Sequence, residues 1–289
     1  MAKWTGKTRG NTLGYGIIIY AIKIFGLGMG YFMLWFVSFY FYFFVPTNRR
    51  ILKNFYFNFV KIPKWKIPLV IYKNHILLGQ SIIDKMALLI GVGDKIGYTN
   101  DGEHHLRELT KNKQGAFLIS GHVGNWDVAG NLLKGFDANV SVVMYQNEHE
   151  KIQKLLEAQG SVPKFKVIPI GEDLSHLIRI YTAIKGGDLV CMHADRYMKD
   201  MKTTEIEFFG QPAKFPIGPF QLIEKLKAPY SFVFAMKESR FSYFFSATKP
   251  VIASKPAQDI AVDFVHLLEE KVKAYPEQWY NYYNFHDKE

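Results

Sequence analysis

The residues with the clearest catalytic potential lie in one short stretch, SGHVGNWD at residues 120–127. The apolar run before it, residues 116–119, predicts a buried strand, and residues 126–133 predict a helix after it. His122 therefore falls at the carboxyl end of a strand and Asp127 in the first turn of a helix. A hydrogen bond between these two side chains would hold the imidazole in one tautomer and stabilise its protonated form, as a general base acting on a hydroxyl or amine requires.

The same pattern also fits a turn without catalytic function, in which the aspartate caps the helix and the histidine packs in the core. The two glycines of the stretch permit a tight turn in either case. The start of the following helix offers unpaired N–H groups and a positive dipole end to a developing negative charge. Spacing alone leaves both interpretations open.

A second polar group, HADR at residues 193–196, follows the apolar run 188–192. Parallel strands place such residues together at their carboxyl ends, so we expect this group to lie near His122 and near Tyr145, which ends another predicted strand. Arg196 is suited to bind a phosphate or carboxylate through two N–H groups at once. The alternative is that the two charged residues of the group pair with neighbours and cap a loop.

From residue 102 onward the chain alternates between helical and short apolar patterns, which predicts an α/β fold. We expect a central, mostly parallel or mixed sheet with helices on both faces, within one domain at residues 66–289. The predicted strands are 116–119, 140–145, 165–170, 188–192, 230–234 and 241–247. The predicted helices are 103–111, 126–133, 149–158, 174–184 and 259–274.

The segment before this domain has a different composition. Residues 24–45 contain no charged side chain, and their number meets the roughly 20 residues that a helix needs to cross a bilayer. Pro46 ends this element, and an amphipathic helix over 48–60 and a further helix over 69–89 follow, in which Asp84 and Lys85 read as surface charges. We therefore predict a membrane-anchoring helical segment at residues 1–65. Spanning the membrane, lying in its surface and packing on the domain all remain open.

Composition limits the partners that the protein can have. The formal net charge is +10 and the basic residues are spread along the chain, which favours an anionic membrane or an acidic carrier protein. Nucleic acid is not expected, because no helix-turn-helix signature, zinc spacing or RNA-binding aromatic motif occurs. The single cysteine, Cys191, lies in an apolar run and excludes an internal disulfide and a multi-cysteine metal site.

Four ordered segments resemble one known family. GHVGNWD at 121–127 resembles the His-x4-Asp/Glu signature of the bacterial lipid A biosynthesis (lauroyl/myristoyl) acyltransferases, part of the broader lysophospholipid acyltransferase group. The segments HADR at 193–196, FFGQPAKFPIGP at 208–219 and YPEQWY at 275–280 resemble further motifs of that family in the same order. One departure is that Gln146 follows Tyr145 where the family often has arginine.

The resemblance implies an enzyme that moves a fatty acyl chain from acyl carrier protein, or from coenzyme A, to a hydroxyl or amine of a lipid acceptor. The acceptor would be lipid A or a related glycolipid or aminolipid, at the cytoplasmic side of the bacterial inner membrane. His122 would be the general base and Asp127 would orient it, with no metal and no cofactor. Substrate-binding roles fall to Asn125, Tyr145, Asp195, Arg196 and Gly218.

Three other classes of protein remain possible on these residues. A thioesterase or lipase would use the same groups to activate water, and a membrane scaffold would need no catalytic pair. A metal-dependent enzyme would require His122, Asp127 and His193 to converge on an ion, although no helical His-x-x-x-His pattern supports this. An apolar pocket ending at His122 would favour the acyltransferase.

Overall fold

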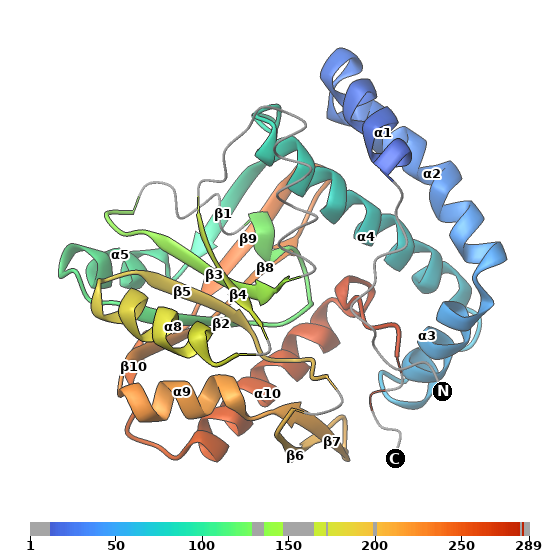
Figure 1. The fold of residues 1–289 in the computed structure, drawn as a ribbon. Helices are drawn as coiled ribbons and strands as arrows, with labels where there is room; N and C mark the ends of the chain where they lie inside the picture. Colours follow the sequence, from blue (N-terminus) through green and yellow to red (C-terminus); the bar gives the residue numbers. More distant parts are fainter. Residues whose placement is uncertain are drawn as a thin grey trace.

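The computed structural model describes residues 12–128, 136–146, 165–171, 173–198, 201–283 and 285. In this part of the chain, an eight-stranded mixed sheet forms the centre of the molecule, with helices packed on both faces and an apolar helical segment along one side (Figure 1). The expected fold class is confirmed. The predicted helix over 149–158 and most of the one over 126–133 lie outside the described residues.

The sheet is parallel except at two pairings. Its strand order is β1-β9-β8-β2-β5-β3-β4, and β10 pairs with β8; the antiparallel pairs are β8 with β9 and β8 with β10. The strands in this order are β1 (Gly97–Asp101), β9 (Ser242–Ala247), β8 (Pro229–Lys237), β2 (Ala116–Ser120), β5 (Leu189–His193), β3 (Val140–Tyr145) and β4 (Lys166–Ile170), with β10 at Val251–Ile252. Because β2, β5 and β3 are parallel, their carboxyl ends lie along one edge.

Alternate side chains of the central strands enter different cores, as the two-residue repeat of a strand requires. Phe117 and Ile119 of β2 belong to the larger cluster, which also contains apolar residues of α8 (Ser175–Lys185), α9 (Gly218–Leu226) and α10 (Ala257–Ala274). Ala116 and Leu118 belong to a smaller cluster on the opposite face, together with Leu106 of α5 (Glu103–Lys111). The sheet therefore separates a thick layer of helices from a thin one.

The amino-terminal segment consists of several helices: α1 (Thr12–Phe25), α2 (Leu27–Phe44), α3 (Pro46–Asn58) and α4 (Ile67–Leu89). The predicted apolar helix over 24–45 is confirmed as α2, but it begins at Leu27, because the chain breaks at Gly26, whose φ of +79° suits glycine. Pro46 occupies the first position of α3, where its missing N–H costs nothing. The α4 helix lies between α2 and the sheet (Figure 1). The domain division at residue 65 stays a prediction.

Four strands are absent from the expectations: β1, β6, β7 and β10. β6 (Thr203–Phe208) and β7 (Gln211–Pro216) form an antiparallel hairpin, and positive φ angles at both Phe209 and Gly210 close its two-residue turn. Alternate residues of this hairpin are buried in the larger core cluster. By contrast, β1 is exposed at each of its residues, and its polar sequence GYTND carries no apolar alternation, so only its pairing with β9 marks it as a strand.

Candidate active site

The turn that carries His122 is shaped by two glycines. Gly124 has a φ of +70°, and a Cβ atom there would lie 2.2 Å from the backbone oxygen of Ala235. A Cβ atom on Gly121 would lie 3.2 Å from the carboxyl carbon of Asp195. Only glycine allows β8 to approach the turn this closely, and an unsubstituted Gly121 leaves room for the carboxylate beside His122.

Asp195 is the carboxylate that holds His122. Its Oδ1 lies 2.7 Å from His122 Nδ1, and its Oδ2 accepts a hydrogen bond of 2.8 Å from the His122 backbone N–H. A carboxylate accepts, so Nδ1 carries the proton and Nε2 keeps its lone pair. Burial alone would raise the pKa of Asp195, but the charge and hydrogen bond of His122 and the charge of Arg196 outweigh it and hold that pKa well below its usual value. This histidine and carboxylate have the arrangement of a general base and its orienting group.

The predicted hydrogen bond between His122 and Asp127 is wrong. Asp127 forms an ion pair of 3.0 Å with Lys85, because the first turn of the helix directs its carboxylate toward α4. Asp127 still lines the cavity described below. Lys85 is only 15% exposed, so the interpretation of Asp84 and Lys85 as surface charges is also wrong: both are paired inside the structure.

His193 belongs to the HADR group that the sequence predicts near His122, but the sequence gives it a role only in the metal-dependent alternative. Its Nδ1 lies 3.2 Å from His122 Nε2, and its ring meets the ring of Trp126 edge to face. Burial, and repulsion from His122 whenever that ring is protonated, hold the pKa of His193 well below its usual value, so its ring is neutral. The register of the parallel strands, which pairs Ser120 with His193, brings the two histidine rings together.

The other predicted substrate contacts divide into two sets. Tyr145, Arg196 and Gly218 line the same cavity as His122. Asn125 is buried behind the turn, where its Nδ2 donates hydrogen bonds to Ser81 O and Tyr243 Oη, so its predicted substrate contact is not formed. Asp195 is likewise covered, at 1% exposure.

A cavity of about 320 Å³ reaches His122 along the carboxyl edge of the sheet. This volume falls at the lower end of the range for ligand pockets. Apolar residues from the thin side of the sheet form one part of its wall: Leu118, Val140, Val142, Cys191, Val233 and Phe245. The wall on the thick side adds polar side chains, namely Tyr145, His176, Arg196, Gln221 and Lys225. The cavity can therefore take an alkyl chain on one side and polar or anionic groups on the other.

The polar side chains around the cavity are acids, bases and cations. Burial raises the pKa of Cys191 to about 12, so this thiol is protonated and is no nucleophile at neutral pH. The described residues contain no group of three His, Cys, Asp or Glu side chains placed to hold a metal ion. His122 Nε2 is thus the basic atom at the cavity, and a substrate hydroxyl or amine that reaches it takes the place of the hydrogen bond from His193 Nδ1.

Aromatic side chains cover the outer face of α2. This helix is long and apolar enough to cross a membrane by length and composition, and no other described helix meets both criteria. Its inner face packs on α4, whereas Phe32, Trp35, Phe36, Phe39, Tyr40, Phe43 and Phe44 are exposed. An exposed apolar surface of this extent marks a site of contact with a lipid or a protein.

The fold and the site agree with what comparison with known families finds. The sequence model of bacterial lipid A biosynthesis acyltransferases matches residues 30–284. The match covers most of the chain, which therefore belongs to this family.

More particular relatives come from Mycobacterium tuberculosis. The chain is 30% identical over 125 residues to the phosphatidylinositol mannoside acyltransferase of strain CDC 1551 / Oshkosh, and equally to that of strain ATCC 25618 / H37Rv. The aligned part is 42% of this chain and 38% of each relative. The similarity thus spans less than half of the curated relatives' length.

Proposed function

We propose that the protein transfers a fatty acyl chain from a thioester to a hydroxyl or amine of a lipid acceptor at a membrane, with His122 as the general base. The observation that carries this proposal is the His122–Asp195 pair at the inner end of an apolar cavity. Asp195 takes the orienting role first expected of Asp127. The donor is acyl carrier protein or coenzyme A, since both present an activated acyl group on a phosphate-containing arm.

The reaction needs one proton acceptor and no acyl-enzyme. The acceptor hydroxyl or amine loses its proton to His122 Nε2 as its oxygen or nitrogen attacks the thioester carbon. The tetrahedral intermediate then collapses, the carbon–sulfur bond breaks, and the leaving thiolate takes that proton back from Nε2. Asp195 stabilises the imidazolium between the two steps. Ser120 precedes a glycine and lacks a nucleophile-elbow context, so it is not assigned a covalent role.

The cavity supplies the binding groups for this reaction. Its apolar wall receives the acyl chain, and Arg196 and Lys225 on its polar wall are placed to interact with a phosphate of the donor arm or with the developing oxyanion. Gly218 begins α9 at the same wall and adds the amino end of a helix. Gln146, which stands where the family often has arginine, removes one positive charge, so the acceptor need not be lipid A itself.

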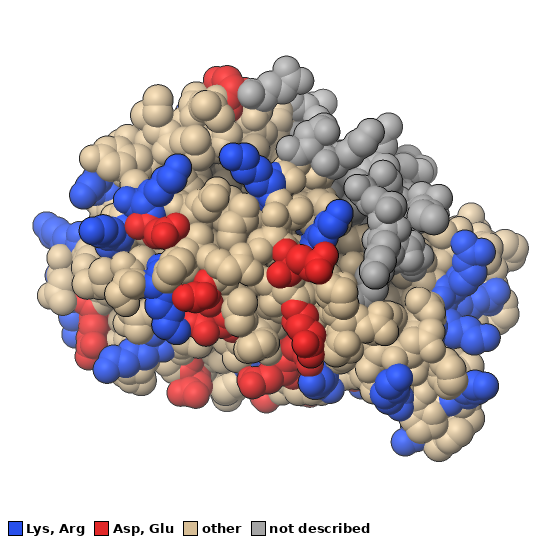
Figure 2. Space-filling view, turned by 90° about the horizontal axis from the view of Figure 1, so that it is seen from below, with Lys and Arg blue, Asp and Glu red and all other residues tan. Residues whose placement is uncertain are grey.

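The amino-terminal helices bring this site to the acceptor. The aromatic face of α2 enters the lipid, and basic residues of α3 and the following loop interact with anionic headgroups. Figure 2 shows Lys and Arg side chains without acidic neighbours at the end of the molecule where α3 lies. The exposed basic residues of this segment are Arg50, Lys53, Lys61, Lys64 and Lys66. We assign the cytoplasmic face of a bacterial inner membrane as the working location.

The test uses the purified protein in vesicles with a radiolabelled acyl donor and a panel of acceptor lipids. His122→Ala is expected to lower acyl transfer at least a hundredfold with an unchanged melting temperature, as the loss of a general base predicts. Retention of more than a tenth of the activity would refute the base assignment. Release of free fatty acid without acceptor would favour a thioesterase, and lipidomics of cells with and without the gene would identify the acceptor.

A further inference from the structure

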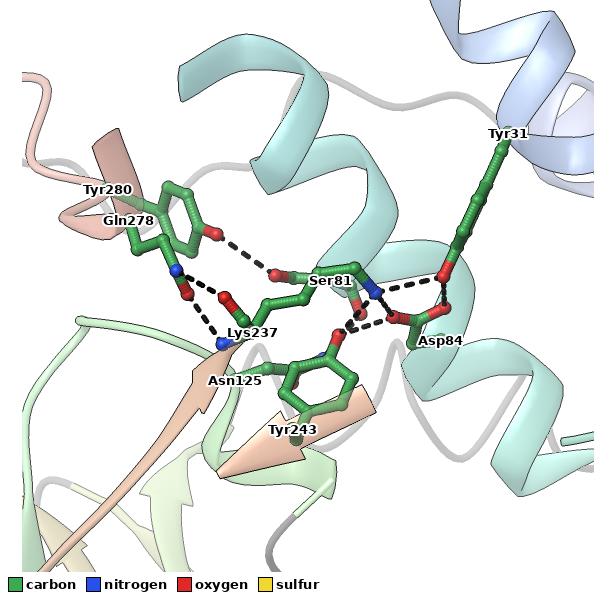
Figure 3. Close-up of polar contacts among 8 residues, drawn as sticks. All are labelled: Tyr31, Ser81, Asp84, Asn125, Lys237, Tyr243, Gln278 and Tyr280. Carbon is green, nitrogen blue, oxygen red and sulfur yellow. Dashed lines mark hydrogen bonds and ion pairs between the residues drawn. The ribbon is translucent and has the colours of Figure 1, made fainter. Parts of the chain in front are cut away.

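A buried ion pair connects the amino-terminal helices to the rest of the protein. Asp84 of α4 is 0% exposed, and it is the first acidic residue in the sequence. Its carboxylate accepts hydrogen bonds from the hydroxyls of Tyr31 on α2 and Tyr243 on β9, and from Lys237 Nζ at the end of β8, 2.6 Å away (Figure 3). Side chains from α2 and from the consecutive strands β8 and β9 thus converge on one carboxylate of α4.

The network continues to the turn that carries His122. Tyr243 Oη donates to Asp84, so its lone pairs accept from Asn125 Nδ2 at 3.2 Å and from Lys237 Nζ at 3.3 Å. Asn125 lies three residues after His122 and also donates to the Ser81 backbone oxygen of α4. Because the Tyr243 hydroxyl gives its one proton to Asp84, it acts only as an acceptor toward Asn125.

A second connection joins Lys237 to the same turn through the backbone. The Gln278 side chain exchanges hydrogen bonds of 2.8 Å with the backbone N–H and C=O of Lys237, and its own backbone oxygen accepts from Gly124 N–H at 2.9 Å. Tyr280 N–H donates to His122 O at 3.1 Å, and Tyr280 Oη lies 3.1 Å from Ser81 Oγ (Figure 3). Both ends of the turn are thereby held by groups attached to the network.

An ion pair at this depth is not explained by stability. Removing two charges from water costs about as much as their attraction returns, and apolar residues of similar volume often stabilise a protein as well or better. What the buried pair provides is a fixed geometry, because each partner has one set of satisfied contacts. All four side chains at its centre are buried: Tyr31, Asp84, Lys237 and Tyr243.

We propose that Tyr31, Asp84, Lys237 and Tyr243 are positioning residues that hold the His122 turn in its active conformation, so that α2 is part of the catalytic structure as well as a membrane anchor. This inference rests on His122 being the general base of the proposed function. α2 contributes to this network through Tyr31, whose hydroxyl donates a hydrogen bond to Asp84 Oδ1. A loosened network moves Asn125 and, with it, the imidazole.

The test compares variants that remove hydroxyls or the charge pair with a matched control. Tyr243→Phe and Tyr31→Phe each remove one hydroxyl that donates to a buried carboxylate. Ser141→Ala removes the same kind of contact elsewhere, because Ser141 Oγ donates to buried Asp188 at 2.8 Å at the amino end of β3, on the opposite edge of the sheet. The double variant Asp84→Asn/Lys237→Met removes both charges and leaves neither one unpaired.

The measurements are kcat and KM for acyl transfer, the melting temperature, and the imidazole nitrogen shifts of His122 in ¹⁵N-histidine-labelled protein. We expect kcat to fall at least tenfold in Tyr243→Phe and in the double variant, and at least threefold in Tyr31→Phe, with KM within twofold and the His122 signals displaced. Ser141→Ala should keep at least half of kcat and leave these signals unmoved.

Smaller losses of kcat, or a loss in Ser141→Ala as large as that in Tyr243→Phe, would overturn the proposal. The nitrogen shifts separate this outcome from failure of the proposed function, since they report on the His122 ring whether or not the chosen donor and acceptor are turned over. Unmoved His122 signals in all network variants would likewise overturn it.

Discussion

Asp195 and Asp84 are both almost completely buried, and each holds a basic partner, but the two partners have different surroundings. His122 is 28% exposed on its side-chain surface and faces the cavity, whereas Lys237 is 3% exposed and enclosed by two tyrosines. A basic group that reaches a cavity can gain and lose a proton during a reaction. Lys237 is closed off from the cavity and holds one set of hydrogen bonds, so its role is to fix geometry.

The sharpest test of this comparison is Asp195→Asn against Asp127→Asn. The first is expected to lower kcat about a thousandfold, or about 4 kcal/mol, because an amide cannot stabilise the imidazolium or enforce its tautomer. Asp127→Asn should lower kcat less than tenfold, since its carboxylate pairs with Lys85. Steady-state kinetics on both variants measures the two losses of kcat. A larger loss in Asp127→Asn than in Asp195→Asn would assign the orienting role to Asp127.

Unfolding measurements test the buried ion pair of Asp84 and Lys237. Asp84→Asn alone leaves the Lys237 ammonium buried without a carboxylate, which is expected to cost about 3 kcal/mol of the free energy of unfolding. The double variant Asp84→Asn/Lys237→Met should recover most of that loss. Chemical denaturation in detergent micelles measures both, and an additive double variant would contradict the ion-pair description.

The outer and inner faces of α2 also have different surroundings. Phe36 is 66% exposed on the outer side of α2, while Tyr31 is buried on the inner side. Phe36→Ser should weaken binding to anionic vesicles by about tenfold, as expected for about 1.5 kcal/mol of lost apolar burial, without a change of kcat in micelles. Vesicle flotation measures the binding to anionic vesicles. A loss of kcat in micelles would show that the two faces do not act separately.

The smallest expected effect concerns His193 and pH. Its pKa is lowered in the folded protein by burial and by His122, so below about pH 6.5 the unfolded chain binds a proton that the folded protein does not. Stability should therefore fall as the pH drops from 6.5 to 5.5, by about 1 kcal/mol for this group. His193→Gln should flatten the decline. Asp195 adds no pH dependence to the stability in this window. The stability that its lowered pKa provides is fully present there and is lost only as the pH falls below about 4.

Local pattern was enough to predict the central strands and most helices, but not the partner of His122. The helix Glu103–Lys111 and the strand Val140–Tyr145 have the predicted bounds, because their apolar periodicity is strong. The nearer aspartate in sequence, Asp127, was preferred over Asp195, which lies 73 residues away from His122. Only the register of β2 against β5 brings Asp195 to the imidazole.

The buried network shows a signal that local pattern did contain. Asp84 lies in a long apolar helix and is the first acidic residue of the chain, and a carboxylate that becomes buried with such a helix is almost never unpaired. Its partners, Lys237 and Tyr243, stand at the ends of two strands far along the sequence. The pairing could not be derived without the fold, but a buried partner could have been expected.

The hydrogen bond from Tyr280 N–H to His122 O has a consequence for how the protein folds. During translation the apolar amino-terminal helices and His122 leave the ribosome long before the carboxyl-terminal segment that contains Tyr280. The turn that carries His122 therefore gains this hydrogen bond only after synthesis has passed residue 280. A chain released before that point has every residue of the turn but lacks the contact that holds it.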